Sequence, residues 1–243
     1  MFIKIIKNTL KESYGFGYFN LYKRYFNNIG NKTLIYHAFG SKLNHDTYGI
    51  SIDIKKFREH MIYLNDNYQF HSLKNSLDDE MSISITIDDG YKDSLDAIDI
   101  LNNLEIPFSI FITTDMINKP LYLSEEDIND IEKLETAQVG SHGKTHTKLG
   151  QLTESRQRLE LSKSKDVLEN ICRSNINSIS LPHGSFNNIT LNLASSLGYK
   201  LIATSIKGFN NTSNNSIIKR NEIIKTDKIN DLEKKIKGYY DFY

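Results

Sequence analysis

Strand-like and helix-like patterns alternate along most of the 243 residues, and this alternation constrains the fold more than any other feature. Short runs of β-branched and aromatic residues, typical of strands, are separated by segments whose apolar residues recur at helical spacing. No internal repeat, proline-rich linker or low-complexity block interrupts this order. The alternation therefore predicts an α/β fold with a largely parallel sheet or barrel.

The patterns also give approximate bounds for the elements. Strands are expected at residues 33–37, 70–73, 83–87, 107–113, 137–141, 179–181 and 201–203, with a further apolar run at 217–224. Helices are expected after Asp53, around 97–104, after Ser124, from Thr153 to about Cys172, from about Ile189 to Gly198, and around 229–236. Apolar and polar residues alternate in 83–87, which predicts one buried face. In the helix after Thr153 we expect Leu159, Val167, Leu168 and Ile171 to face inward.

Composition limits the classes of function. The 30 acidic and 30 basic residues balance, which argues against bulk electrostatic capture of nucleic acid. Cys172 is the single cysteine, so an intrachain disulfide and a cysteine-based zinc site are excluded. No apolar run resembles a secretory signal or reaches the roughly 20 residues of a membrane span. We therefore expect a cytoplasmic protein, with a mature form whose signal has been removed as the alternative.

The N-terminal segment differs from the rest of the chain. Residues 1–30 are basic, aromatic and amphipathic, whereas residues 31–243 carry the alternating pattern of one domain. Lysines interleave with Ile and Leu in residues 2–26, and aromatic residues follow them. Such a segment suits peripheral contact with a membrane surface. The alternative is an N-terminal helix packed on the domain.

Chemically versatile side chains gather where predicted strands end. His37, Asp88, Asp89, His142 and the Pro182–Gly184 segment each follow such a strand. Barrels and open parallel sheets build their sites at the carboxyl ends of strands, so we expect these residues to lie near one another. By itself, the Asp-Asp-Gly sequence favours a plain acidic turn, because Asp-Gly is a frequent pair in turns.

His142 and His146 add a metal-binding pattern. They lie four residues apart, and on a helical turn this spacing puts both imidazoles on one side. With one aspartate they make a two-histidine, one-carboxylate set for Zn²⁺, or for Co²⁺, Ni²⁺ or Fe²⁺. The second aspartate is then free to accept a proton from an attacking water. A further histidine is suited to protonate an amine leaving group.

Four segments resemble the polysaccharide deacetylases, carbohydrate esterase family 4, and occur in that family's order. Residues 86–90 are similar to its Thr-Phe-Asp-Asp-Gly motif, and residues 106–111 resemble the strand that follows it. Residues 141–146 resemble its His-Ser/Thr-x-x-x-His metal motif, with Gly143 in place of Ser or Thr. Residues 181–184, Leu-Pro-His-Gly, are similar to its Arg-x-Pro-Tyr-Gly motif.

Within this family, the chain resembles one branch in particular, the biofilm poly-N-acetylglucosamine deacetylases. Residues 34–37, Leu-Ile-Tyr-His, followed by a helix at 57–68, are similar to the early Tyr-His segment of that branch. The whole resemblance covers about residues 33–224. It implies a distorted (β/α) barrel with fewer than eight full repeats.

The resemblance also implies roles for particular residues. Asp88 is the implied general base, and Asp89, His142 and His146 are the implied metal ligands. Pro182, His183 and Gly184 would line the acetyl pocket, and the backbone N–H of His183 would help to bind the oxyanion.

At two positions the chain departs from the family's motifs, so other residues would have to take over those two roles. Ser180 stands where the family has the arginine that orients the base, and no histidine follows His183 to act as the late acid. His37 is therefore the candidate acid, with a buried structural histidine as the alternative. Arg220 is the candidate for orienting Asp88, with a solvated surface arginine as the alternative.

Together these features predict a metal-dependent hydrolase that removes N-acetyl groups from an amino-sugar glycan or its precursor, through attack by a metal-bound water. One alternative is a deformylase or deacetylase of a lipid-linked sugar. Another is a catalytically silent carbohydrate-binding protein on the same fold, which the two departures would favour.

Overall fold

The computed structural model describes residues 13–18, 30–75, 81–211 and 216–241. Most of residues 1–30, for which packing on the domain and contact with a membrane were the two alternatives, lies outside the described residues. Among the residues that the structure does describe, no helix is both long and apolar enough to cross a membrane.

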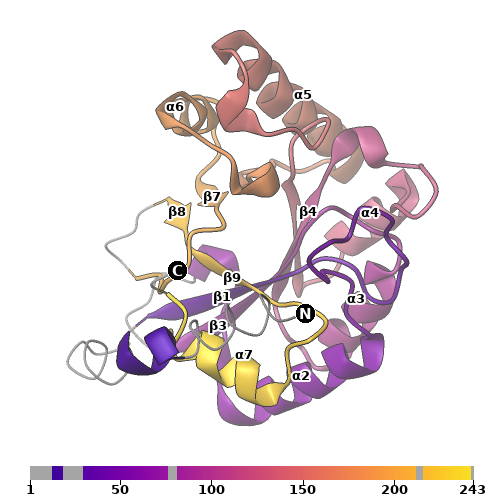
Figure 1. Cartoon of the computed structure of the whole chain (residues 1–243). Coiled ribbons are helices and arrows are strands. Elements are labelled where there is room, and N and C mark those ends of the chain that lie inside the picture. The colour runs from indigo at the N-terminus through magenta and orange to yellow at the C-terminus, as the bar shows by residue number, and fades with distance from the viewer. Residues whose placement is uncertain (1–12, 19–29, 76–80, 212–215, 242–243) are drawn as a thin grey trace.

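Nine strands of the described chain form one sheet (Figure 1). The hydrogen-bonded order is β8-β7-β6-β5-β4-β3-β1-β9, and β2 pairs with β3 outside this path. The bounds are β1 Asn31–Tyr36, β2 Gln69–Phe70, β3 Ser82–Ile87, β4 Phe108–Ile112, β5 Ala137–Ser141, β6 Ser178–Ser180, β7 Leu201–Ala203, β8 Ile217–Ile218 and β9 Arg220–Glu222. Neighbouring strands pair in parallel, so their carboxyl ends share one edge of the sheet.

The two ends of the strand order lie next to each other, and this closes the sheet into a distorted barrel. Lys219 alone separates β8 from β9, although these strands occupy opposite ends of the order. Asn31 and Asn210 also exchange backbone hydrogen bonds of 2.7 and 2.8 Å across the gap. The described part of the β7–β8 connection contains no helix. The predicted α/β barrel with fewer than eight full repeats is therefore confirmed.

Helices follow most strands and lie around the outside of the sheet (Figure 1). They are α2 Ile54–Asn67, α3 Ser94–Asn103, α4 Glu125–Glu132, α5 Glu154–Cys172, α6 Asn188–Ser196 and α7 Ile229–Ile236. Asp53 caps α2, as predicted, because its side chain accepts a hydrogen bond from the backbone N–H of Lys55. Ser124 and Asp127 form a reciprocal capping box on α4.

Strand β3 is buried on both faces, which differs from the single buried face that its alternation predicted. Ile83, Ile85 and Ile87 belong to the hydrophobic core. The hydroxyl groups on the other face find backbone acceptors instead of water: Ser84 Oγ donates to the His71 carbonyl at 2.6 Å, and Thr86 Oγ1 donates to the Leu34 carbonyl at 2.8 Å. The interior of the barrel therefore tolerates small polar residues that have partners.

Two residues of α5 that were predicted to face inward are exposed instead. Leu159 and Val167 keep 52% and 38% of their surface in solvent. Gln157 and Glu160 are buried in their place. Gln157 accepts a 2.6 Å hydrogen bond from Thr190 Oγ1, so the buried side of α5 is partly polar. Apolar spacing could not identify this side because polar residues with partners occupy it.

Candidate functional site

Strand β3 delivers two adjacent aspartates into the carboxyl edge of the barrel. The backbone N–H of Asp88 donates to the Tyr36 carbonyl at 2.9 Å and so continues the ladder between β1 and β3. Asp89 and Gly90 then adopt left-handed φ angles of 76° and 79°. A non-glycine residue in this region costs on the order of 1–3 kcal/mol, and such strain is typical of functional sites. The sharp turn gives the two carboxylates different surroundings.

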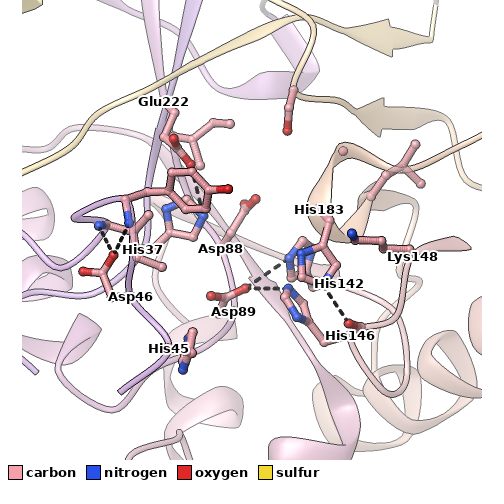
Figure 2. A pocket seen from close by; sticks show the side chains of 16 residues that line it. His37, His45, Asp46, Asp88, Asp89, His142, His146, Lys148, His183 and Glu222 are labelled. Atoms are coloured by element: carbon pink, nitrogen blue, oxygen red, sulfur yellow. Dashed lines mark hydrogen bonds and ion pairs between the residues drawn. The ribbon is translucent and has the colours of Figure 1, made fainter. Parts of the chain in front are cut away.

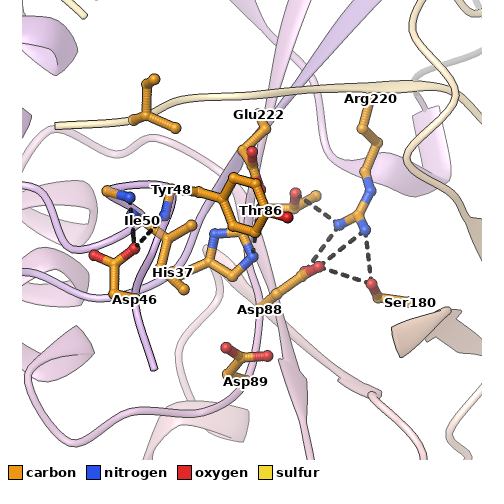
Figure 3. Close-up of polar contacts among 12 residues, drawn as sticks. His37, Asp46, Tyr48, Ile50, Thr86, Asp88, Asp89, Ser180, Arg220 and Glu222 are labelled. Carbon is orange, nitrogen blue, oxygen red and sulfur yellow. Dashed lines mark hydrogen bonds and ion pairs between the residues drawn. The ribbon is translucent and has the colours of Figure 1, made fainter. Parts of the chain in front are cut away.

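Asp88 is held by Arg220 and Ser180 (Figure 3). Arg220 donates from Nη1 and Nη2 to the two carboxylate oxygens of Asp88 at 2.8 and 2.9 Å. Ser180 Oγ donates to Asp88 Oδ2 at 2.8 Å and accepts from Arg220 Nη2 at 2.6 Å. The guanidinium is itself fixed, since Nε donates to the Thr204 carbonyl at 2.9 Å. This bidentate contact restricts the rotation of Asp88.

The same contacts keep Asp88 ionised. Burial by itself raises the pKa of Asp88, but the charge of Arg220 outweighs it, with further help from His142, and the pKa lies below its usual value. Asp88 is only 3% exposed and Arg220 only 1%, so water screens their attraction weakly. Asp88 is therefore a carboxylate at neutral pH and can accept a proton.

Asp89, His142 and His146 converge on one point (Figure 2). His142 Nε2 and His146 Nε2 each lie 3.2 Å from Asp89 Oδ1. One ligand atom from each of the three residues lies within 4.8 Å of the others, as a shared metal ion requires. Within the described chain, this is the one cluster of histidine, cysteine or acidic residues with such geometry.

The tautomer of His142 favours a cation in this cluster. His142 Nδ1 lies 2.8 Å from the Ser180 carbonyl, which can only accept, so Nδ1 carries the proton. In the neutral ring, Nε2 then presents a lone pair towards the negatively charged Asp89. Two electron-rich atoms at this distance repel unless a proton or a metal ion lies between them. The donor set of two imidazoles and one carboxylate suits a divalent transition metal.

A loop, and not the helical turn considered from the sequence, brings the two histidines together. His142 follows β5 directly, and Gly143 and His146 have left-handed φ angles of 73° and 60°. Glu160 on α5 fixes this loop: its Oε2 accepts from the backbone N–H groups of Lys144 and Thr145 at 3.0 and 2.8 Å. The sequence reasoning missed Glu160, because its spacing does not reveal which loop α5 covers.

His37 lies on the other side of the two aspartates from His142 and His146 (Figure 2). It follows β1, and its Nε2 is 4.0 Å from Glu222 Oε1 at the end of β9. Glu222 is half exposed and, like His37, lines the site cavity. The sequence reasoning also missed Glu222. Its position two residues after Arg220 was a usable signal, since residues two apart on a strand share a face.

Pro182–Gly184 form a short 3₁₀ turn after β6. His183 and Gly184 have φ angles of 57° and 61°. The His183 ring lies 4.4 Å from that of His146, between centroids, and its Nε2 donates to the His146 carbonyl at 3.2 Å. The turn therefore forms a wall beside the His146 loop.

A cavity of about 570 Å³ connects these residues. Its lining includes His37, Asp88, Asp89, His142, His146, His183, Gly184 and Glu222. Two predicted site residues are not part of the lining: Arg220 lies behind Asp88 and is buried, and Pro182 is buried beside Gly143. The arrangement can bind a cation and can provide one fixed carboxylate and one imidazole to a ligand.

Comparison with known proteins gives one family. Residues 76–202 match the family model described as polysaccharide deacetylase. The protein YxkH of Bacillus subtilis (strain 168), named for the polysaccharide deacetylases, is 29% identical over 185 residues. That alignment covers 72% of this chain and 64% of YxkH, so the chain spans less than two thirds of this relative.

Solved structures share the fold. The deacetylase PplD of Streptococcus pyogenes, in complex with acetate, has a TM-score of 0.75 and 22% identity over 85% of this chain and 98% of its own. IcaB from Ammonifex degensii has a TM-score of 0.74 and 17% identity over 88% of this chain and 97% of its own. These structures confirm the distorted barrel.

Proposed function

The chain belongs to the polysaccharide deacetylase family, and from this premise we propose that it is a metal-dependent hydrolase that removes N-acetyl groups from an amino-sugar glycan or its precursor. The observation that carries the proposal is the pairing of two features. Asp88 is a buried carboxylate, ionised and held by Arg220. Beside it, Asp89, His142 and His146 form a set suited to a divalent cation.

The metal would be held by Asp89, His142 and His146, with Zn²⁺ as the first expectation and Co²⁺, Ni²⁺ or Fe²⁺ as alternatives. Such an ion supplies Lewis acidity, which polarises an acetyl carbonyl and makes water more acidic. Arg220 binds both carboxylate oxygens of Asp88, whereas Asp89 Oδ1 faces His142. The two carboxylates therefore have separate partners.

The remaining steps are assigned to this chain's own groups. Asp88 accepts a proton from the water whose oxygen attacks the acetyl carbonyl carbon. His37, across the cavity from the two histidines, donates a proton to the amine nitrogen as the C–N bond breaks. Acetate and a free amine result. Glu222 Oε1 lies 4.0 Å from His37 Nε2 and helps to orient the ring towards the cavity that both residues line.

The Pro182–Gly184 turn would form the wall of the acetyl pocket. His183 and Gly184 line the cavity on the side of the metal ligands. The backbone N–H of His183 is the proposed donor to the oxyanion that develops at the acetyl oxygen.

The first test is release of acetate from N-acetylglucosamine oligomers by metal-loaded and chelator-stripped protein. We expect release with the loaded protein, loss after stripping, and recovery when Zn²⁺ is returned. Equal release before and after complete stripping would contradict the proposal.

The same assay separates the alternatives. A silent carbohydrate-binding protein would bind the oligomers without releasing acetate. A deformylase would release formate from an N-formyl amino sugar faster than acetate from the N-acetyl compound. One reason for considering a silent binding protein was that Ser180 replaces the family's arginine. Arg220 contacts Asp88 instead, which weakens that reason.

A further inference from the structure

The side chain of one tyrosine at the site, Tyr48, makes no hydrogen bond or ring contact with another residue that the structure describes. Tyr48 is 80% exposed, yet it lines the same cavity as His37 and Glu222. Figure 3 shows its ring on the His37 and Glu222 side of Asp88. Among the described residues it is the only phenylalanine or tyrosine of the cavity lining.

The loop that carries Tyr48 is fixed from within. The carboxylate of Asp46 accepts hydrogen bonds from the backbone N–H groups of Tyr48, Gly49, Ile50 and Ser51, at distances of 3.1, 2.5, 3.1 and 3.4 Å. Burial by itself raises the pKa of Asp46, but these N–H groups outweigh it and lower the pKa. The loop is therefore closed by a charged acceptor, which makes stronger hydrogen bonds than a neutral one.

Contacts with the barrel fix the same loop from outside. The Gly49 carbonyl accepts from the backbone N–H of Lys225 at 2.7 Å. Asp93 Oδ2 accepts from the N–H groups of Phe39 and Ser41 at 2.8 and 2.9 Å. The backbone of Tyr48 is thus ordered before any ligand arrives, and binding need not supply the free energy of ordering it.

We propose that Tyr48 is a substrate-positioning residue whose ring stacks on a sugar ring of the glycan beside the reacting acetyl group. A pyranose presents C–H groups on its faces and hydroxyl groups around its edge. The flat ring of Tyr48 fits the face, while Glu222, His45 and Lys148, which also line the cavity, can hydrogen-bond to the edge. This inference rests on the proposed function and deepens it, because it assigns a residue to recognition of the sugar.

The kinetic test compares Tyr48→Ala with Tyr48→Phe on N-acetylglucosamine oligomers. For Tyr48→Ala we expect KM to rise about tenfold with kcat changed less than twofold, because stacking is present before and during the reaction. Tyr48→Phe keeps the ring and should restore KM to within about twofold. An unchanged KM in Tyr48→Ala, or equal KM values for the two variants, would overturn the inference.

A binding test is independent of turnover. The chain contains no tryptophan, so Tyr48→Trp introduces a single fluorescent reporter at the proposed subsite. We expect its emission to shift to shorter wavelength when the oligomer binds. The matched control is Tyr14→Trp, at another exposed tyrosine, 73% accessible and outside the cavity lining, whose emission should not shift.

The two tests separate failure of this inference from failure of the proposed function. Acetate release without a shift in the Tyr48→Trp emission would leave the deacetylase proposal standing and remove the role of Tyr48. If the emission of Tyr48→Trp shifts but the unaltered, metal-loaded protein releases no acetate, the deacetylase proposal is wrong and the role of Tyr48 in binding sugar is supported.

Discussion

Asp88 and Asp89 are neighbours in the chain but have different partners. Arg220 and Ser180 bind Asp88, whereas two histidine nitrogens approach Asp89. The separation depends on the left-handed backbone of Asp89, which turns its carboxylate away from that of Asp88. Consecutive residues can therefore take the two roles that we propose, Asp88 as the base and Asp89 as a metal ligand.

Arg220→Met tests the contact with Asp88. The substitution leaves a buried carboxylate without its counter-charge, so we expect the free energy of unfolding to fall by about 3–5 kcal/mol. Activity should fall at least a hundredfold, because Asp88 is no longer held or kept ionised. Chemical denaturation and acetate release measure the two effects.

A double variant shows whether the charge is the cause. Asp88→Asn together with Arg220→Met removes both charges, so its loss of stability should be smaller than the sum of the two single losses. Additive losses would mean that Arg220 acts elsewhere in the core.

Sequence reasoning identified Arg220 as a candidate partner of Asp88 but did not predict that Ser180 joins the same contact. Arg220 was a candidate because it follows an apolar pair in a predicted strand run. Ser180 was interpreted as the loss of an arginine, whereas it donates to Asp88 and accepts from Arg220. Local patterns do not specify strand order, so they could not show that β9 lies beside β1 and behind Asp88.

At the scale of elements, α5 supports the loop between β5 and His146, one of the proposed metal ligands. The Glu160 carboxylate accepts hydrogen bonds from Lys144 and Thr145 of this loop. Glu160→Gln replaces one carboxylate oxygen with an NH₂ group, which cannot accept them. We expect the affinity for Zn²⁺ to fall about 10- to 100-fold, as is typical when groups behind metal ligands are changed. Isothermal titration calorimetry measures it directly.

The matched control for this variant lies on the same helix. Glu154 is exposed and pairs only loosely with Arg158, 3.8 Å away, so Glu154→Gln should keep the affinity of the unaltered protein. Equal affinities for the Glu160 and Glu154 variants would show that the loop keeps its shape without Glu160.

Element bounds followed well from sequence where caps and periodicity agreed. Asp53 and Ser124 begin helices as predicted, because their side chains satisfy N–H groups at the helix start. The predicted strand at 70–73 is shorter, since β2 ends at Phe70 and a 3₁₀ turn follows at Leu73–Asn75. Leu159 and Val167 were misplaced because α5 buries polar residues with specific partners.

At the scale of the whole molecule, buried His60 links stability to pH. Its Nδ1 lies 3.2 Å from the Tyr36 hydroxyl, and burial lowers the pKa of His60 to about 4. An unfolded histidine titrates near 6.5, so between these values the unfolded chain binds a proton that the folded chain does not. The free energy of unfolding should therefore fall as the pH drops from about 6.5 towards 4, with His60 contributing up to about 3 kcal/mol.

The measurement is the free energy of unfolding at several pH values for the unaltered chain and for His60→Asn. The variant should show a shallower decline below pH 6.5, whatever its stability at neutral pH. The same slope in both proteins would mean that other groups cause the loss in acid.

Asp88→Asn tests the proposed role of the base most directly, when metal content and acetate release are measured in the same preparation. We predict one equivalent of metal, as in the unaltered protein, with acetate release reduced by about 10² to 10⁴. The control is Asp130→Asn, at an exposed aspartate paired with Lys133, which should keep both properties. Full metal-dependent release by Asp88→Asn would contradict the assignment of Asp88 as the base.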